Sequence, residues 1–435
     1  MSEETRPRCQ LAFSGVQGIG GLALRRALVD PGASVVAVFD PLVSAADYAG
    51  YLTHNRTHGR FDGTVRLHDD NSTGAANPRV VVMEVTAVLA SLPAQQPHSN
   101  STGSTATNCH SIRWFTGTPS DRVLPWRPAA LATEADPTGI QQGGPDVCLQ
   151  VGRESCDAAV AILRGGCDTV VTTAASAGSS VSVPLIMPRI NEHKIHTSTC
   201  LVRAGRRTAT GIAALAQMLN NCVPGVAIIS TALMPLDALS DEPTLSVRRS
   251  SLRCGLARAT VPRSSAAGTA VGEVLPALKS QIEITGSEYV TPASAEVAML
   301  SLRVLLKEPR TIAEICTELE SHCGREGMPG FNVGYVKSAA LVSSDFACDE
   351  HSVVIDEQLT KEANASRTWA TEGFTLCAWC SDWGHAAELV GLALTAHLQK
   401  VAARNSDVQR MPLSVAEKSR LPCLKASKKK LKPKQ

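Results

Sequence analysis

The chain has 435 residues, of which 44 % are hydrophobic and 4 % aromatic, and its formal net charge is +2. This length allows two or three domains with buried cores, and the near-zero charge excludes a global field that attracts nucleic acid or membranes. No stretch has the length and apolarity of a membrane span. The fourteen cysteines have no regular framework, and the N-terminus lacks an apolar signal segment. We therefore expect reduced thiols and a cytoplasmic protein.

Residues 10–40 predict one strand–helix–strand unit of a parallel sheet. QLAFSG has the pattern of a short strand, GLALRRALVD that of an amphipathic helix, and SVVAVFD that of a buried strand. After residue 145 the same alternation returns in PDVCLQVG, RESCDAAVAILRGG and CDTVVTTAA. The first part of the chain is therefore expected to be an α/β sheet with helices on its faces.

A glycine-rich turn, Gly15-Val-Gln17-Gly18-Ile-Gly20, joins the first predicted strand to the first helix. Dinucleotide-binding turns use glycines for a tight bend, for close approach of the pyrophosphate and for helix packing. Here Gln17 stands where the second glycine belongs, and Gly18 follows it. Asp40 ends the second strand at the spacing of a carboxylate that binds an adenosine ribose, which favours NAD over NADP. Two interpretations stay open: a site for NAD, or a turn that keeps the fold and no longer binds a nucleotide.

Four further segments, in order along the chain, resemble those of glyceraldehyde-3-phosphate dehydrogenases. HNRTHGRFDGTV (54–65) is similar to Y-D-S-x-H-G-x-F-x-G-x-V, and VPRSSAAGTAVGEVLPAL (261–278) to I-P-x-S-T-G-A-A-K-A-V-G-x-V-L-P-x-L. GYVKSAALVSSDFACDEHSVVID (334–356) resembles G-Y-x-x-x-x-x-V-S-S-D-F-x-x-D-x-H-S-x-x-x-D, and AWCSDWGH (378–385) resembles W-Y-D-N-E-W-G-Y. Together with the first unit they cover roughly residues 10–400.

The resemblance implies a Rossmann-type NAD-binding domain, a second α/β catalytic-type domain with a largely antiparallel sheet, and a homo-oligomer, by family a tetramer. In that family a cysteine at a helix N-terminus attacks the aldehyde of a small phosphorylated sugar. A histidine acts as general base, hydride passes to NAD, and phosphate releases the thioester in a glycolytic step. Such chemistry requires a thiolate, a proton acceptor and anion sites.

The residue-by-residue comparison identifies Cys200 as the candidate nucleophile, because Thr197-Ser-Thr-Cys200 matches the family's N-A-S-C. The segment KIHTSTC predicts a strand that ends at Cys200. The family's helix begins at once after its cysteine, whereas here TATGIAAL (208–215) matches it only after LVRAGRR (201–207). A different gap places Arg207 in the catalytic position, and an ordinary strand-end cysteine is a further alternative.

The remaining catalytic positions are altered. Leu233 occupies the place of the general-base histidine, and Ser264 and Ser265 keep the hydroxyls of the family's S-T-G phosphate site. No arginine stands at the family's R-V-P-T position, where Val290 or a neighbour is found. Loss of a general base costs about 10²–10⁴-fold in rate. Two hypotheses follow: a divergent dehydrogenase whose activity is weakened or lost, or a non-catalytic structural or interaction subunit that could contact RNA.

Domain boundaries follow from composition and from the resemblance. We expect the NAD-binding domain over 1–199, with disordered insertions at about 93–111 and 127–145, and the second domain over 200–375. A C-terminal helix over 376–405 should return to the first domain, and a disordered tail over 406–435 carries six lysines near its end. These lysines are compatible with nuclear import or a nucleic-acid contact, and equally with a solubilising tail.

Overall fold

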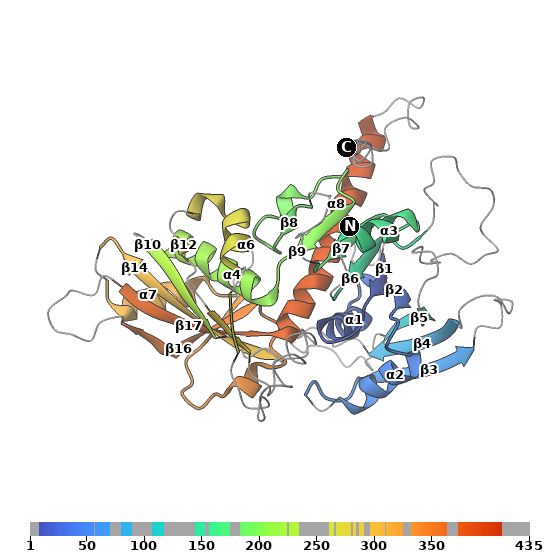
Figure 1. The fold of residues 1–435 in the computed structure, drawn as a ribbon, viewed down its shortest axis with the longest axis horizontal. Coiled ribbons are helices and arrows are strands. Elements are labelled where there is room, and N and C mark those ends of the chain that lie inside the picture. The colour runs from blue at the N-terminus through green and yellow to red at the C-terminus, as the bar shows by residue number, and fades with distance from the viewer. Residues whose placement is uncertain are drawn as a thin grey trace, which may run out of the picture.

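The computed structural model of the chain contains two β-sheet domains joined by a long C-terminal helix (Figure 1). It describes residues 8–55, 57–69, 80–88, 107–116, 144–152, 156–174, 183–223, 226–234, 261–264, 267–279, 282–283, 287–290, 296–308, 310–324, 332–362 and 373–410. Among the described residues, no helix is long and apolar enough to cross a membrane.

The first domain is built on a nine-stranded sheet with the order β3-β4-β5-β2-β1-β6-β7-β9-β8. Most of these strands pair in parallel with their neighbours. In order across the sheet, the parallel strands are β5 (Thr107–Phe115), β2 (Ala33–Phe39), β1 (Cys9–Ser14), β6 (Val147–Gln150), β7 (Thr169–Thr172), β9 (Leu201–Ala204) and β8 (Leu185–Ile186). Antiparallel strands β4 (Val80–Val88) and β3 (Gly63–Asp69) complete the edge beside β5. The carboxyl ends of β1, β2, β6, β7 and β9 therefore share one edge of the sheet, where ligands bind in open α/β folds.

Helices α1 (Ile19–Val29), α2 (Ala45–His54) and α3 (Cys156–Arg164) connect these strands, as the alternating pattern predicts. The core of the domain also includes α8 (Asp382–Arg410), whose Leu389, Val390 and Leu392 pack in the same cluster as Leu11 and Leu24. Helix α8 therefore packs against the first domain. Figure 1 shows this helix running from the second sheet along α1, β6 and β7.

The second domain contains a six-stranded sheet with the order β12-β10-β14-β17-β16-β15. Its long strands β10 (Val226–Met234), β14 (Val297–Leu306), β17 (Gly373–Ser381) and β16 (Val353–Glu362) pair antiparallel, while β12 (Ile282–Glu283) and β15 (Val333–Val336) add parallel edges. Helices α4 (Arg207–Cys222), α6 (Ala267–Val274) and α7 (Ile312–His322) pack on it, and β11 (Val261–Ser264) pairs with β13 (Ser287–Val290). The expected largely antiparallel second sheet is confirmed.

Four predicted boundaries are corrected by the strands and the helix. Residues 107–111 belong to β5, whose exposure alternates along TNCHSIRWF, so the predicted insertion ends before Thr107. Pro145 is buried and its carbonyl accepts the N–H of Asp168, so the second insertion ends before it. Residues 201–204 form β9 of the first sheet, which moves the domain boundary past Ala204. Residues 376–381 belong to β17, and α8 reaches Arg410. Residues 93–106 and 127–143 and the tail from 411 lie outside the described residues.

Candidate functional site

The glycine-rich turn lies between β1 and α1 at the carboxyl edge of the first sheet. Gly15 has φ +85°, and a Cβ there would come within 2.2 Å of the carbonyl oxygen of Val151. A Cβ on Gly20 would meet the carbonyl oxygen of Gly15 at 2.3 Å. These two positions therefore require glycine, and they hold the turn against the neighbouring strand end. Gly18 caps α1 and is exposed together with Gln17.

Asp40 follows β2 beside this turn, and its carboxylate is fully engaged by the protein. Oδ2 accepts the backbone N–H of Val16 at 2.8 Å, and Oδ1 accepts those of Leu42 and Val43 at 2.8 and 2.9 Å. The side-chain amide of Gln17 lies over it, with Nε2 3.5 Å from Oδ1. Asp40 is 0 % exposed. The carboxylate thus fixes the turn to the end of β2.

The fit of these residues to NAD is partial. The N-terminus of α1 and the glycine turn have the geometry that accepts a pyrophosphate, because backbone N–H groups and the helix dipole favour an anion there. The ribose position does not fit, because the Asp40 carboxylate is covered and its oxygens already accept hydrogen bonds. Displacement of the Gln17 side chain would be required before a ribose hydroxyl could reach it.

Cys200 lies at the opposite edge of the first sheet from the glycine turn. The predicted strand ending at Cys200 is wrong: β9 begins after it, at Leu201. A turn precedes it instead, in which Thr199 Oγ1 accepts the N–H of His196 and Thr199 N–H returns to the His196 carbonyl. The Cys200 carbonyl pairs with Val170 at the start of β7, and its half-buried thiol donates to the Ser198 carbonyl at 3.5 Å.

Arg207 is the first residue of α4 and follows β9 at the carboxyl edge. Six residues separate it from Cys200, and the four of them that form β9 span about 13 Å at the ordinary rise of a strand. Its side chain is 6 % exposed, and Nη1 lies 2.5 Å from Oδ1 of Asp382, the first residue of α8. A buried cation at a helix N-terminus is opposed by the helix dipole, so the Asp382 carboxylate supplies the compensating charge.

The other predicted site residues lie in the second domain. Leu233 is on β10, where its backbone is paired with Leu300 of β14. Ser264 ends β11, opposite Ser287. Ser265 lies outside the described residues, as does the side chain of Ser264. The structure therefore brings Gly15, Gln17, Gly18, Gly20 and Asp40 together and places Cys200 apart from them. It also pairs Arg207, which the sequence indicated only with a different gap, with Asp382, which the sequence analysis did not indicate.

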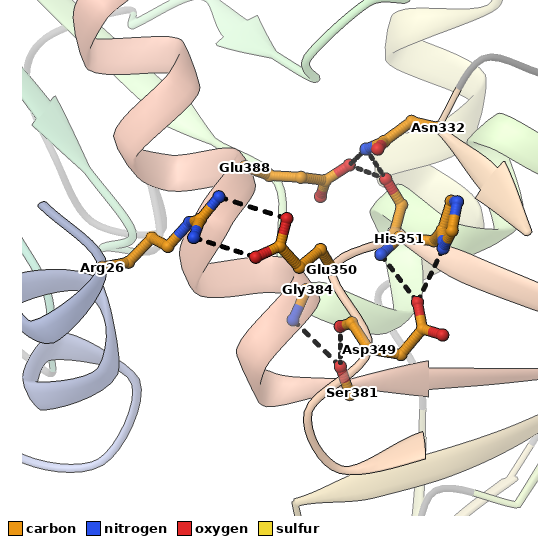
Figure 2. A network of polar contacts seen from close by, with 9 residues as sticks. Arg26, Asn332, Asp349, Glu350, His351, Ser381, Gly384 and Glu388 are labelled. Carbon is orange, nitrogen blue, oxygen red and sulfur yellow. Dashed lines mark hydrogen bonds and ion pairs between the residues drawn. The ribbon is translucent and has the colours of Figure 1, made fainter. Parts of the chain in front are cut away.

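A polar network joins the two domains around the start of α8 (Figure 2). Arg26 of α1 forms a two-pronged ion pair with Glu350, with contacts of 2.8 and 3.1 Å. His351 Nδ1 lies 2.7 Å from Oδ1 of Asp349, and this hydrogen bond raises the pKa of His351 above its usual value. Ser381 donates to the Asp349 carbonyl and accepts the N–H of Gly384.

The buried end of the same network ties α8 to the loop before β16. Glu388 accepts hydrogen bonds from Asn332, at 2.7 Å, and from Ser352. Ser352 also accepts from Asn332, so the three side chains form a closed set (Figure 2). The motifs at 334–356 and 378–385 therefore meet in space, and their polar residues hold the domains in register.

These features define a two-domain α/β protein with a Rossmann-like first domain. A glycine turn lies at the carboxyl edge of the parallel sheet, α4 opens the second domain with its mixed sheet, and the long C-terminal helix α8 packs back on the first domain.

Comparison with known proteins identifies the particular class. The family described as "Glyceraldehyde 3-phosphate dehydrogenase, C-terminal domain" matches residues 207–382, the segment bounded by the ion-paired Arg207 and Asp382. The chain is 28 % identical over 392 residues to glyceraldehyde-3-phosphate dehydrogenase 2 of Kluyveromyces marxianus, covering 88 % of this chain and 97 % of that one. It is 25 % identical over 387 residues to the Schizosaccharomyces pombe enzyme 1, covering 88 % and 96 %. Residues 207–382 thus match the C-terminal domain of this family, and the chain is similar to two glyceraldehyde-3-phosphate dehydrogenases, at 25 % and 28 % identity, over 88 % of its length.

Proposed function

We propose that this chain is a non-catalytic member of its family, which keeps the two-domain fold but does not oxidise glyceraldehyde 3-phosphate. The observation that carries the proposal is the buried ion pair between Arg207 and Asp382 at the N-terminus of α4. One of the two gap placements aligns the nucleophilic cysteine of the family with Arg207. In that alignment, the salt bridge of Arg207 with Asp382 occupies the position of the reactive thiol.

Arginine cannot take over the chemistry of a thiol. Its guanidinium stays protonated at any working pH and has no free electron pair for attack on an aldehyde. Cys200 precedes β9, a strand about 13 Å long, so it lies at the amino edge of the sheet rather than beside the glycine turn. The base position is Leu233, whose side chain cannot accept a proton. Nucleophile and base are thus both replaced.

The role that remains is that of a structural or interaction subunit. NAD binding is weak in this proposal, because the Gln17 amide covers the carboxylate that would hold the ribose. Family relatives support a homo-oligomer, a tetramer by resemblance, and a cytoplasmic location, which agrees with a cytosolic relative from Ginkgo biloba. The lysine-rich tail adds a nuclear or nucleic-acid contact as a further part of the proposal.

A direct assay tests the loss of activity. Purified protein is incubated with glyceraldehyde 3-phosphate, NAD and phosphate, and NADH formation is followed by absorbance beside an active yeast relative. The expected result is no NADH above the enzyme-free rate, with Cys200→Ser and the exposed-cysteine control Cys109→Ser indistinguishable from the unchanged chain.

The opposite result is equally clear. Turnover that Cys200→Ser abolishes and Cys109→Ser leaves intact would overturn the proposal and make Cys200 the nucleophile. Turnover that neither substitution alters would also contradict a non-catalytic role, since another group would then perform the reaction. A thermal-shift titration with NAD, run separately, distinguishes loss of the cofactor from loss of the chemistry.

A further inference from the structure

The amino edge of the first sheet, opposite the glycine turn, gathers three side chains of metal-ligating type. Cys9 is the first residue of β1, Asp146 directly precedes β6, and His397 lies on α8. One ligand atom from each lies within 4.8 Å of the other two. Among the described residues this is the one group of three such side chains so close together. The three positions are far apart in sequence and meet only through the fold.

Burial makes this group unlike an exposed acidic cluster. Cys9 is 1 % exposed and His397 is 9 % exposed. His397 Nδ1 lies 3.5 Å from Oδ2 of Asp146, longer than an ordinary hydrogen bond, and its Nε2 is buried without a hydrogen-bond partner among the described residues. A buried imidazole in this state lacks the partners that such groups normally have. A metal ion would provide one.

The Asp146 carboxylate is already oriented from outside the group. The backbone N–H of Gln10, next to Cys9 on β1, donates to Oδ2 at 2.8 Å. Hydrogen bonds of this kind fix the direction of a ligating carboxylate and leave its other oxygen available. Lys400, one turn beyond His397 on α8, donates to the carbonyl of Asp168 at 3.0 Å.

The separations agree with a tetrahedral site after small movements. Zinc–sulfur bonds of about 2.3 Å and zinc–nitrogen or zinc–oxygen bonds of about 2.0–2.1 Å place neighbouring ligand atoms roughly 3.3–3.6 Å apart. Closing from the present separations requires shifts of about 1 Å, which side-chain rotation supplies. Rotation of the His397 imidazole by half a turn can place either ring nitrogen toward the ion.

We propose that Cys9, Asp146 and His397 form a binding site for one divalent transition-metal ion of the zinc class, with water as the fourth ligand. The site ties α8 to the starts of β1 and β6. It is independent of the nucleotide edge and of the proposed function.

The three types of ligand atom determine which metal ion the site prefers. One sulfur, one nitrogen and one oxygen suit borderline-soft zinc, whereas magnesium and calcium prefer all-oxygen sites. On binding, Cys9 releases its proton to solvent and the thiolate sulfur bonds the metal, while the imidazole stays neutral. One thiolate and one carboxylate then balance the two charges of the ion, so the loaded group is neutral. Neutrality removes the main cost of burying it.

The test is a zinc competition titration against a chromophoric chelator with the full-length protein, after its bound metal has been removed. The unchanged chain is expected to bind one equivalent of zinc. Cys9→Ser and His397→Gln should each weaken binding at least 100-fold. The matched controls Cys109→Ser and His193→Gln, which change an exposed cysteine and an exposed histidine, should bind as the unchanged chain does.

A second measurement keeps the proposal testable if a variant fails to fold. Cobalt added to the unchanged chain should give the visible bands of a tetrahedral ion and a near-ultraviolet charge-transfer band of a single thiolate. Zinc, but not magnesium, should raise its melting temperature. Cobalt bound without the thiolate band, or zinc affinity unchanged in both Cys9→Ser and His397→Gln, would overturn the site. The Asp146–His397 contact would then be a plain ion pair.

Discussion

Nη1 of Arg207 lies 2.5 Å from Oδ1 of Asp382, so the first residue of α4 is joined to the first residue of α8. Arg207 and Asp382 are the first and last residues of the family-matched segment, and each helix begins where a β-strand of a different sheet ends. The arginine is 6 % exposed and the aspartate 20 %. The contact therefore fixes the second domain's first helix to the helix that returns to the first domain.

Asp382→Asn should lower the free energy of unfolding by about 3–5 kcal/mol, because it leaves a buried guanidinium uncompensated. Adding Arg207→Met to this variant removes the buried positive charge as well, and should recover part of that loss. Urea denaturation measures both. Glu350→Gln, which breaks the exposed ion pair with Arg26, is the control and should cost under about 1 kcal/mol. If Asp382→Asn and Glu350→Gln lowered the free energy of unfolding equally, the Arg207–Asp382 contact would not behave as a buried ion pair.

Gln17→Gly should tighten NAD binding by about tenfold or more, because it uncovers the Asp40 carboxylate and restores a glycine in the turn. Gln17→Ala separates these two effects, since it removes the amide but keeps a Cβ. Isothermal titration with NAD gives the affinities. If the two variants bind NAD no better than the unchanged chain, the Gln17 amide is not what blocks the ribose position.

Gly384→Ala should destabilise the protein by about 3 kcal/mol, the upper range for a forced contact. A Cβ at Gly384 would come within 2.1 Å of the His351 carbonyl oxygen, and backbone there cannot move without breaking the network of Figure 2. Gly391→Ala, on the same helix with nothing within 4 Å, is the matched control. It should stabilise by about 0.5–1 kcal/mol. Chemical denaturation of both variants checks the difference in sign.

Stability should fall as the pH rises past about 6.5, in part because of His351. Its hydrogen bond to Asp349 raises its pKa in the folded protein, so the stabilisation is complete below the unfolded pKa of about 6.5 and is lost as the pH rises through the higher folded value. His351→Gln should therefore flatten the decline between about pH 6 and pH 8. The exposed His193→Gln should leave the slope as it was. Melting temperatures across this range measure the slope, and an unchanged slope in His351→Gln would refute the assignment.

The sequence was sufficient where periodicity and glycine spacing act together. The β1–α1–β2 unit and the turn from Gly15 to Gly20 follow from short-range pattern, because a tight turn between a strand and a helix restricts the residue types it accepts. The same holds for α8, which is long enough for its period to be unambiguous.

Prediction was wrong where a short strand competed with local hydrogen bonding. KIHTSTC has the alternation of a strand, yet the Thr199 hydroxyl closes a turn onto His196 and the strand forms one segment later, in LVRA. That shift decides whether Cys200 or Arg207 opens α4. The four residues of LVRA are too few for their hydrophobic pattern to show where the strand begins.

The group of Cys9, Asp146 and His397 could not be found by spacing at all. The three residues sit at the start, middle and end of the chain, and none belongs to a recognisable metal motif. The order of the parallel strands places Cys9 and Asp146 at the same edge of the first sheet, and α8 is long enough to bring His397 to that edge.

The placement of α8 also has a consequence for how the chain folds during synthesis. Its Ala386, Leu389, Val390, Leu392, Ala393 and Ala396 belong to the same hydrophobic cluster as Leu11, Phe13 and Leu24 of the first strand and helix. The ribosome therefore releases α8, the helix that completes the core of the first domain, only after nearly 400 residues have been made. Until then β1 and α1 present apolar surface with nothing to cover it. The N-terminal domain, although first to emerge, must be among the last parts to reach its native packing.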